Sequence, residues 1–150
     1  MKKIIAFFLC FALLVSVTPQ ADACEQGTIL FSNEYLLEDG LTIIDTVTIF
    51  SQTRLTGRTV SYEKKIYDGT TLVAVIVLEA TFHYDGNSVS VASKSVTQSN
   101  TYDGWRYVQN SLTSSGGTVT LNAKLTKWII LNTSITMTLS CDEDGNISYA

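Results

Sequence analysis

Apolar and polar residues alternate with a period of two along most of the chain. The longest such run covers 72–84, where every even position is apolar and the odd positions change from valine to Glu79, Thr81 and His83. Successive side chains of a strand point to opposite faces, so this alternation predicts a strand. Its first half is expected to be buried on both faces and its second half on one face only. Similar runs cover 118–126 and 135–141.

The alternation that starts at Val119 changes phase at Lys127. Trp128 then lies on the opposite face from the preceding apolar residues, which predicts a bulge or a change of sheet in a strand that continues through Trp128. Further along, Cys141 is in phase with the apolar residues that begin at Ile135. Its sulfur is therefore expected to be buried.

Six pairs of turn-forming residues separate the alternating runs. Asp-Gly and Gly-Gly supply the positive φ angles that tight turns need, so each pair predicts a β-hairpin. No segment after the first 23 residues has a helical period. About eight strands in one small domain predict an all-β fold, an antiparallel β-sandwich or barrel. The six pairs are Asp39-Gly40, Asp68-Gly69, Asp85-Gly86, Asp103-Gly104, Gly116-Gly117 and Asp144-Gly145.

The first 23 residues have the pattern of an export signal. Lys2 and Lys3 precede an apolar run over 4–17, and alanines stand one and three positions before Cys24. This A-x-A pattern predicts an N-terminal signal helix (1–23) that is cleaved, which leaves 24–150 as a single secreted domain. The apolar run is too short for a helix that spans a bilayer, which needs about 20 apolar residues.

The composition of 24–150 excludes one class of partner. This segment carries eight basic and thirteen acidic side chains, a net charge of −5. Proteins that bind nucleic acids neutralise phosphates with clustered lysines and arginines. The acidic domain is therefore not expected to bind nucleic acid.

Two cysteines remain after the signal is removed, Cys24 and Cys141. In an exported protein such a pair predicts a disulfide, here between the start of the domain and its last long strand. Two alternatives stay open. Cys24 can instead be the lipidated first residue of an envelope lipoprotein, although Ala21 and Asp22 depart from the usual lipoprotein pattern, or both thiols can stay free. A membrane is expected as a partner only if Cys24 is lipidated.

No group of residues predicts catalysis, a cofactor or a metal site. His83 is the only histidine, and Glu79 on the same strand lies about 13 Å away, too far for a hydrogen bond. The chain lacks a nucleophile-elbow motif, enough zinc ligands and a glycine-rich phosphate loop. A glycosidase pair of carboxylates stays possible, because the fold rather than sequence spacing brings such a pair together. The acidic segment 142–146 resembles a calcium loop faintly, and a hairpin turn explains it more simply.

Four aromatic residues are the candidates for a binding surface. Tyr102, Trp105 and Tyr107 lie around the Asp103-Gly104 turn, and Trp128 is expected in a neighbouring strand. Exposed rings of this kind stack on sugars or anchor a protein partner. The competing interpretation, that Trp105 and Tyr107 share one strand face and fill the core, is favoured because large aromatic side chains are mostly buried.

Several short segments carry a resemblance to other proteins. They are 80–86 (Ala-Thr-Phe-His-Tyr-Asp-Gly), a Ser/Thr-rich strand, a Trp-bearing strand, and 139–142 (Leu-Ser-Cys-Asp). On these segments, 58–146 resembles a loose family of small, uncharacterised secreted β-rich proteins of Gram-positive bacteria. The resemblance implies an exported β domain and transfers no catalytic residue. Relatives often carry a cysteine where this chain has Val89 and Val91, and the resemblance thus leaves Cys24 as the partner of Cys141.

Together these observations predict a secreted, non-catalytic β-sandwich that binds a protein or carbohydrate partner at or near the cell surface. The alternative is an envelope lipoprotein that displays the same domain through Cys24. Two weaker alternatives are a hydrolase and a protein that inserts a Thr/Ser-rich hairpin, such as 118–139, into lipid.

Overall fold

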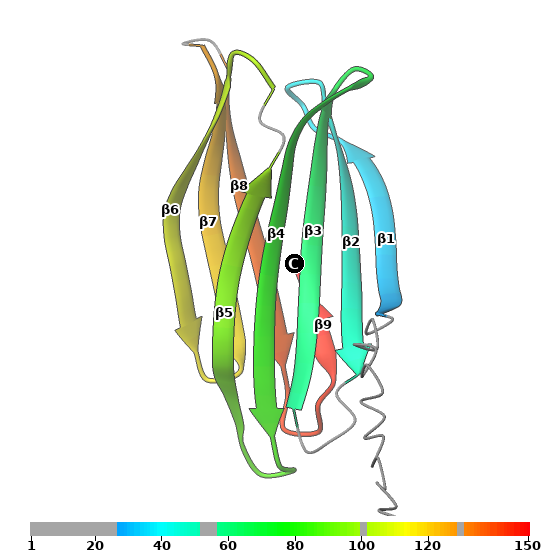
Figure 1. The fold of residues 1–150 in the computed structure, drawn as a ribbon, viewed down its shortest axis with the longest axis vertical. Helices are drawn as coiled ribbons and strands as arrows, with labels where there is room; N and C mark the ends of the chain where they lie inside the picture. The colour runs from blue at the N-terminus through cyan, green and yellow to red at the C-terminus, as the bar shows by residue number, and fades with distance from the viewer. Residues whose placement is uncertain (1–26, 52–56, 100–101, 129–130) are drawn as a thin grey trace, which may run out of the picture.

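The computed structural model describes residues 27–51, 57–99, 102–128 and 131–150, and within them the chain forms two antiparallel β-sheets (Figure 1). The first sheet has five strands in chain order, β1 to β5, and the second has four, β6 to β9. The bounds are β1 (Thr28–Leu36), β2 (Leu41–Ser51), β3 (Gly57–Asp68), β4 (Thr71–Tyr84), β5 (Val89–Ser99), β6 (Trp105–Ser115), β7 (Thr118–Lys127), β8 (Leu131–Cys141) and β9 (Ile147–Tyr149).

The two sheets face each other and bury one core between them. The inward positions of the long strands carry its apolar side chains, for example Tyr62, Phe82, Leu121 and Met137. β4 follows the predicted pattern, since its first half is buried on both faces and its outward residues beyond Val77 are partly or fully exposed. The prediction of an all-β antiparallel sandwich is thereby confirmed, and the two separate sheets decide against the barrel.

The six turn-forming pairs lie at the ends of strands. Each pair contains a glycine with positive φ, and five of the six pairs join strands that are neighbours in one sheet. The Asp103-Gly104 pair was predicted as a hairpin, and this is wrong. It lies between β5 and β6, where the chain passes from the first sheet to the second. The local signal for a tight turn is the same in both settings, because it does not specify which strands the turn connects.

The region around Trp128 also differs from the prediction. The expected strand through Trp128 does not form: β7 ends at Lys127 and β8 begins at Leu131. Trp128 has a φ of 52°, the left-handed conformation, and among the described residues it is the only one other than glycine with a positive φ. The change of phase at Lys127 therefore marks a reversal of the chain and not a bulge, and β7 and β8 pair as neighbours.

The second sheet covers the first only in part. β8 lies against β3 and β4, and β9 pairs with the last three residues of β8. From β9, the ring of Tyr149 packs on Phe31 of β1 and Tyr62 of β3, with ring centroids 4.6 and 6.2 Å apart. Figure 1 shows that β9 runs beside one end of β8 only. Beside the other end of β8, the first sheet extends beyond the second, because β1 and β2 lie farther out than β8.

The predicted signal segment, 1–23, and residues 24–26, the predicted start of the secreted domain, lie outside the described residues. Within the described residues, no helix is long and apolar enough to cross a membrane.

Candidate functional site

Of the four aromatic candidates, one side chain is buried, one is half-buried and two are exposed. Trp105 is buried at 7% exposure, and Tyr107 is half-buried. Tyr102 and Trp128 are exposed by 57% and 75%. The favoured interpretation of Trp105 as a core residue fits this burial, whereas Tyr102 and Trp128 present their rings to solvent.

The structure brings Trp128 to the turn that carries Tyr102 and Trp105. The backbone N–H of Trp128 donates to the Gly104 carbonyl at 3.2 Å, and the backbone N–H of Trp105 donates to the Tyr102 carbonyl at 3.0 Å. The indole of Trp128 also packs on Gly104, where an added Cβ would lie 2.7 Å from Trp128 Nε1. Gly104 has a φ of 81°, so both its backbone conformation and this contact require glycine. Three of the four aromatic candidates thus meet at one end of the sandwich.

A recess of about 350 Å³ lies beside Trp128 at this end. Its charged groups hold one another in place: Lys127 Nζ lies 2.6 Å from Asp68 Oδ2 and 5.2 Å from the centroid of the Trp105 ring. Asp39 accepts hydrogen bonds from the Leu41 N–H at 3.3 Å and from the Thr133 hydroxyl. The recess is lined by Asp39, Leu41, Asp68, Lys127, Trp128 and Leu131.

Trp128 is held in a conformation that its side chain disfavours. For a residue with a Cβ, the left-handed conformation costs about 1–2 kcal/mol because the Cβ crowds the following carbonyl oxygen. A large apolar side chain exposed by 75% contributes little burial to offset that cost. Strain of this kind is common at functional sites, and here it presents a flat ring beside carboxylates and an ammonium group.

Tyr107, by contrast, points its hydroxyl into the protein. The oxygen is buried and has no hydrogen-bond partner among the described residues, and burial raises the pKa of the phenol. A buried hydroxyl without a partner costs about 1–3 kcal/mol of desolvation free energy. Tyr107 therefore offers no hydroxyl to a ligand at the surface.

We expect Tyr107→Phe to leave the free energy of unfolding unchanged or to raise it by up to about 1 kcal/mol, because only the unpartnered hydroxyl is removed. Urea unfolding of the two proteins measures the difference. Tyr62→Phe is the matched control, since it removes a tyrosine hydroxyl that is hydrogen-bonded, and it should be destabilising. A loss of more than about 1 kcal/mol in Tyr107→Phe would mean that the hydroxyl has a partner after all.

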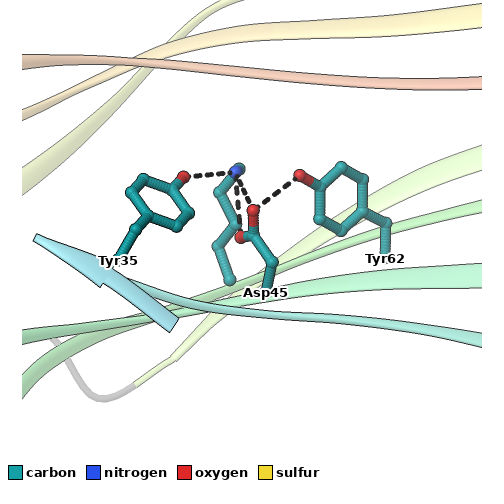
Figure 2. Close-up of polar contacts among 4 residues, drawn as sticks. Tyr35, Asp45 and Tyr62 are labelled. Carbon is teal, nitrogen blue, oxygen red and sulfur yellow. Dashed lines mark hydrogen bonds and ion pairs between the residues drawn. The ribbon is translucent and has the colours of Figure 1, made fainter. Parts of the chain in front are cut away.

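A second group of functional interest was not predicted from the sequence. Asp45 of β2 and Lys64 of β3 are paired across the two strands and are only 6% and 5% exposed. Lys64 Nζ donates to both carboxylate oxygens of Asp45, at 2.8 and 2.9 Å, and to the Tyr35 hydroxyl at 3.1 Å. The Tyr62 hydroxyl donates to Asp45 Oδ2 at 3.0 Å. Figure 2 shows the two tyrosines on either side of the ion pair.

The tyrosines make this ion pair compatible with burial. Lys64 Nζ lies 4.9 Å from the centroid of the Tyr62 ring and 5.6 Å from that of Tyr35, distances at which a ring face attracts a cation. Burial, with Asp45 adding to the effect, raises the pKa of Tyr62 to about 12 against the opposing effect of Lys64. For Lys64 burial alone would lower the pKa, but the contacts with Asp45, Tyr62 and Tyr35 together outweigh it and raise the pKa above its usual range. Lys64 is therefore held as an ammonium ion.

These shifts predict a loss of stability in alkaline solution. Unfolded tyrosine and lysine release their protons near pH 10 and 10.4, whereas native Tyr62 and Lys64 retain theirs to higher pH. The native state then binds more protons than the unfolded state, so the free energy of unfolding falls as pH rises above about 10, by up to about 1.4 kcal/mol per pH unit for each group. Urea midpoints between pH 8 and 11.5 measure this slope. The Asp45→Leu/Lys64→Met double variant should show a shallower slope, and equal slopes would contradict the assignment.

Cys141 has the predicted inward orientation. It is buried and forms no disulfide with a described residue, and burial raises the pKa of its thiol, with Asp142 adding to the effect. Cys24 lies outside the described residues. The disulfide between Cys24 and Cys141 thus stays a prediction, and a thiol with a raised pKa is a poor nucleophile.

The remaining sequence candidates fall at exposed turns and strand ends. His83 is exposed and lines a shallow recess of about 200 Å³ whose carboxylate, Asp85, accepts hydrogen bonds from Asn87 and Ser88. In the segment 142–146, Asp142 accepts from the Asp144 and Asn146 N–H groups and from the Asn146 side chain. These bonds, above all those from Asn146, lower the pKa of Asp142. The turn itself uses these carboxylate oxygens, as the hairpin interpretation predicts.

No family model, curated protein or solved structure matches this chain.

Proposed function

We propose that this protein is a secreted, non-catalytic binding module that holds a carbohydrate at the end of the sandwich occupied by Trp128. The observation that carries the proposal is Trp128 itself: a flat apolar ring, exposed by 75%, that the chain holds in a strained left-handed conformation. The N-terminal export pattern supports a place outside the cell membrane. Cys24 decides between a free protein and an envelope lipoprotein.

The recess beside the ring supplies the polar groups that a sugar needs. A pyranose presents an apolar face to an aromatic ring and hydroxyl groups at its rim. Asp39 and Asp68 offer acceptors and Lys127 offers donors within the same recess of about 350 Å³. This volume is within the usual range of small-ligand sites. The Tyr102 ring, exposed on the adjoining turn, extends the surface over which a longer chain of sugars could lie.

The contacts that the charged groups of the recess make with their neighbours also support a binding role. Lys127 is engaged by Asp68, and Asp39 is engaged by Thr133 and the Leu41 N–H. Such bonds fix the side chains before a ligand arrives, which lowers the entropy cost of binding. They also leave spare lone pairs on both carboxylates, because each carboxylate accepts about four hydrogen bonds.

The proposal is tested by titrating the protein with soluble xylo-, cello-, malto- and chito-oligosaccharides in a calorimeter. At least one series should bind, and Trp128→Ala should weaken that binding by about 10- to 100-fold, the usual effect of removing an aromatic anchor. The control is Val108→Ala, which removes an exposed apolar side chain from β6 and should leave the affinity unchanged. Binding that Trp128→Ala leaves intact, or a Trp128-dependent affinity for a protein and for no sugar, would contradict the proposal.

A further inference from the structure

One edge of the sandwich is only half covered. β9 pairs with Leu139–Cys141 of β8, and Ala150 exchanges two backbone hydrogen bonds with Thr138, at 2.7 and 3.1 Å. Beside Leu131–Met137, the described part of the chain places no strand on this side of β8. Backbone groups of an antiparallel strand point to the same side at every second residue. The N–H and C=O groups of Asn132, Ser134 and Thr136 therefore face this edge, in phase with Thr138.

A groove follows this uncovered edge. Its deeper part, of about 210 Å³, has Tyr35 and Lys64 of the buried polar cluster in its wall, together with the apolar side chains of Leu37, Ile43 and Ile135. A second recess of about 390 Å³ continues it and shares Leu37 and Ser134 with the first. The second recess is lined by Leu37, Glu38, Asp39, Asn132, Thr133 and Ser134. We name the two recesses together the edge groove.

The shape of the sandwich admits a single strand at this edge and not a second copy of the sheet. β8 lies against β3 and β4, so β2 and β1 extend past it by about two strand spacings, roughly 10 Å. A second copy that paired its β8 with this β8 would bring its own β1 and β2 into the same space. One extended segment in line with β9 meets no such obstacle, because β9 already occupies the equivalent place at the other end of β8.

The charge of the groove indicates the chemistry of that segment. Lys64 is neutralised by Asp45 within the wall. At the outer end, Glu38 and Asp39 form no ion pair with any described residue. A segment bound in the edge groove therefore contacts an apolar and neutral wall along the deeper recess. At the end nearest Asn132 it contacts the two carboxylates.

We propose that the edge groove binds an extended peptide of a partner protein as an added β-strand, antiparallel to β8, with apolar side chains at alternate positions and a lysine or arginine at its C-terminal end. The register of β9 carries over, since Leu139 is paired with Tyr149. Inward side chains of the peptide then lie opposite Met137, Ile135 and Thr133. Its basic residue lies near Glu38 and Asp39. This site adjoins the sugar site and shares Asp39 with it, but it does not include Trp128.

The probe is the peptide acetyl-Val-Thr-Val-Thr-Val-Lys-Lys-amide with a fluorescent label, and its binding to the protein is followed by anisotropy. It should bind saturably, and amide exchange of Ser134 and Thr136 should slow when it is bound. The same peptide with its second threonine N-methylated loses a strand hydrogen bond and should bind about tenfold or more weakly.

Two protein variants locate the site. Ser134→Pro removes an N–H that faces the open edge and not β7, so the sheet should tolerate it while peptide affinity falls about tenfold. Glu38→Lys should weaken binding several-fold, whereas Glu34→Lys, an equal change of charge on β1 outside the groove, should not. Trp128→Ala should leave peptide binding unchanged, which separates a failure of this proposal from a failure of the sugar site.

Several outcomes would overturn the proposal. Equal affinity for the parent and N-methylated peptides would mean that the backbone of β8 is not used. Unchanged binding by Ser134→Pro, in a protein whose circular dichroism shows it folded, would place the peptide elsewhere. If sedimentation shows a dimer of the full chain that Ser134→Pro prevents, the occupant is a second copy and not a partner peptide.

Discussion

Lys64→Met is expected to lower the free energy of unfolding by about 3–5 kcal/mol, because it leaves the Asp45 carboxylate buried without its cation. Lys64 supplies three of the hydrogen bonds in the buried cluster, so its loss also leaves the Tyr35 hydroxyl without that donor. Urea unfolding at pH 7 measures the difference.

Two variants control for the loss of a lysine as such. Lys65→Met removes the adjacent lysine, whose side chain is 40% exposed and pairs with Glu63 at 3.0 Å, and it should change stability by less than about 1 kcal/mol. The Asp45→Leu/Lys64→Met double variant removes both charges and should recover most of the stability that Lys64→Met loses. A double variant as unstable as the single one would mean that shape and tyrosine contacts, and not the unpaired charge, dominate.

The second large effect is expected at Trp128, where stability and binding should change in opposite directions. Trp128→Gly relieves a left-handed φ of 52° and should raise the free energy of unfolding by about 1 kcal/mol, while sugar binding is lost. Trp128→Ala removes the same ring but keeps a Cβ in the disfavoured conformation. The difference between the two variants in free energy of unfolding, measured in urea, therefore gives the cost of the left-handed backbone conformation.

Equal stability of the glycine and alanine variants would contradict the idea that Trp128 is strained. A glycine variant that is less stable than the wild-type protein would show that the ring contributes more to folding, through its contact with Gly104, than its exposure indicates. The expected result is the trade-off seen where a protein keeps an unfavourable residue for function.

The strands could be predicted from the sequence because local physics specifies them. Side chains alternate between the faces of a strand, and positive φ favours glycine at the turns. The 72–84 run therefore coincides with β4, and the six turn-forming pairs lie at strand ends. Which sheet each strand joins depends on contacts between distant segments, so the sequence does not distinguish the Asp103-Gly104 turn, which lies between the two sheets, from a hairpin turn.

The site could be predicted only in part. The sequence singles out Tyr102 and Trp128 as candidate aromatics, but it predicts a strand at Trp128 because no glycine marks the turn in which this residue lies. The sequence does carry a signal for the buried pair. Asp45 and Lys64 both occupy inward positions of alternating strands, where a lone charge would be costly, so each required a partner on a neighbouring strand. The edge groove has no local signal, because it arises from the different lengths of β8 and β9.

The most direct test of the proposed function is a nuclear magnetic resonance titration of the two indole N–H signals. The protein contains two tryptophans, one exposed and one buried, and the Trp128→Ala variant identifies which signal belongs to Trp128. With the oligosaccharide that binds best, the Trp128 indole signal should move saturably and the Trp105 signal should move much less. Saturable sugar binding with a stationary Trp128 signal would contradict the account.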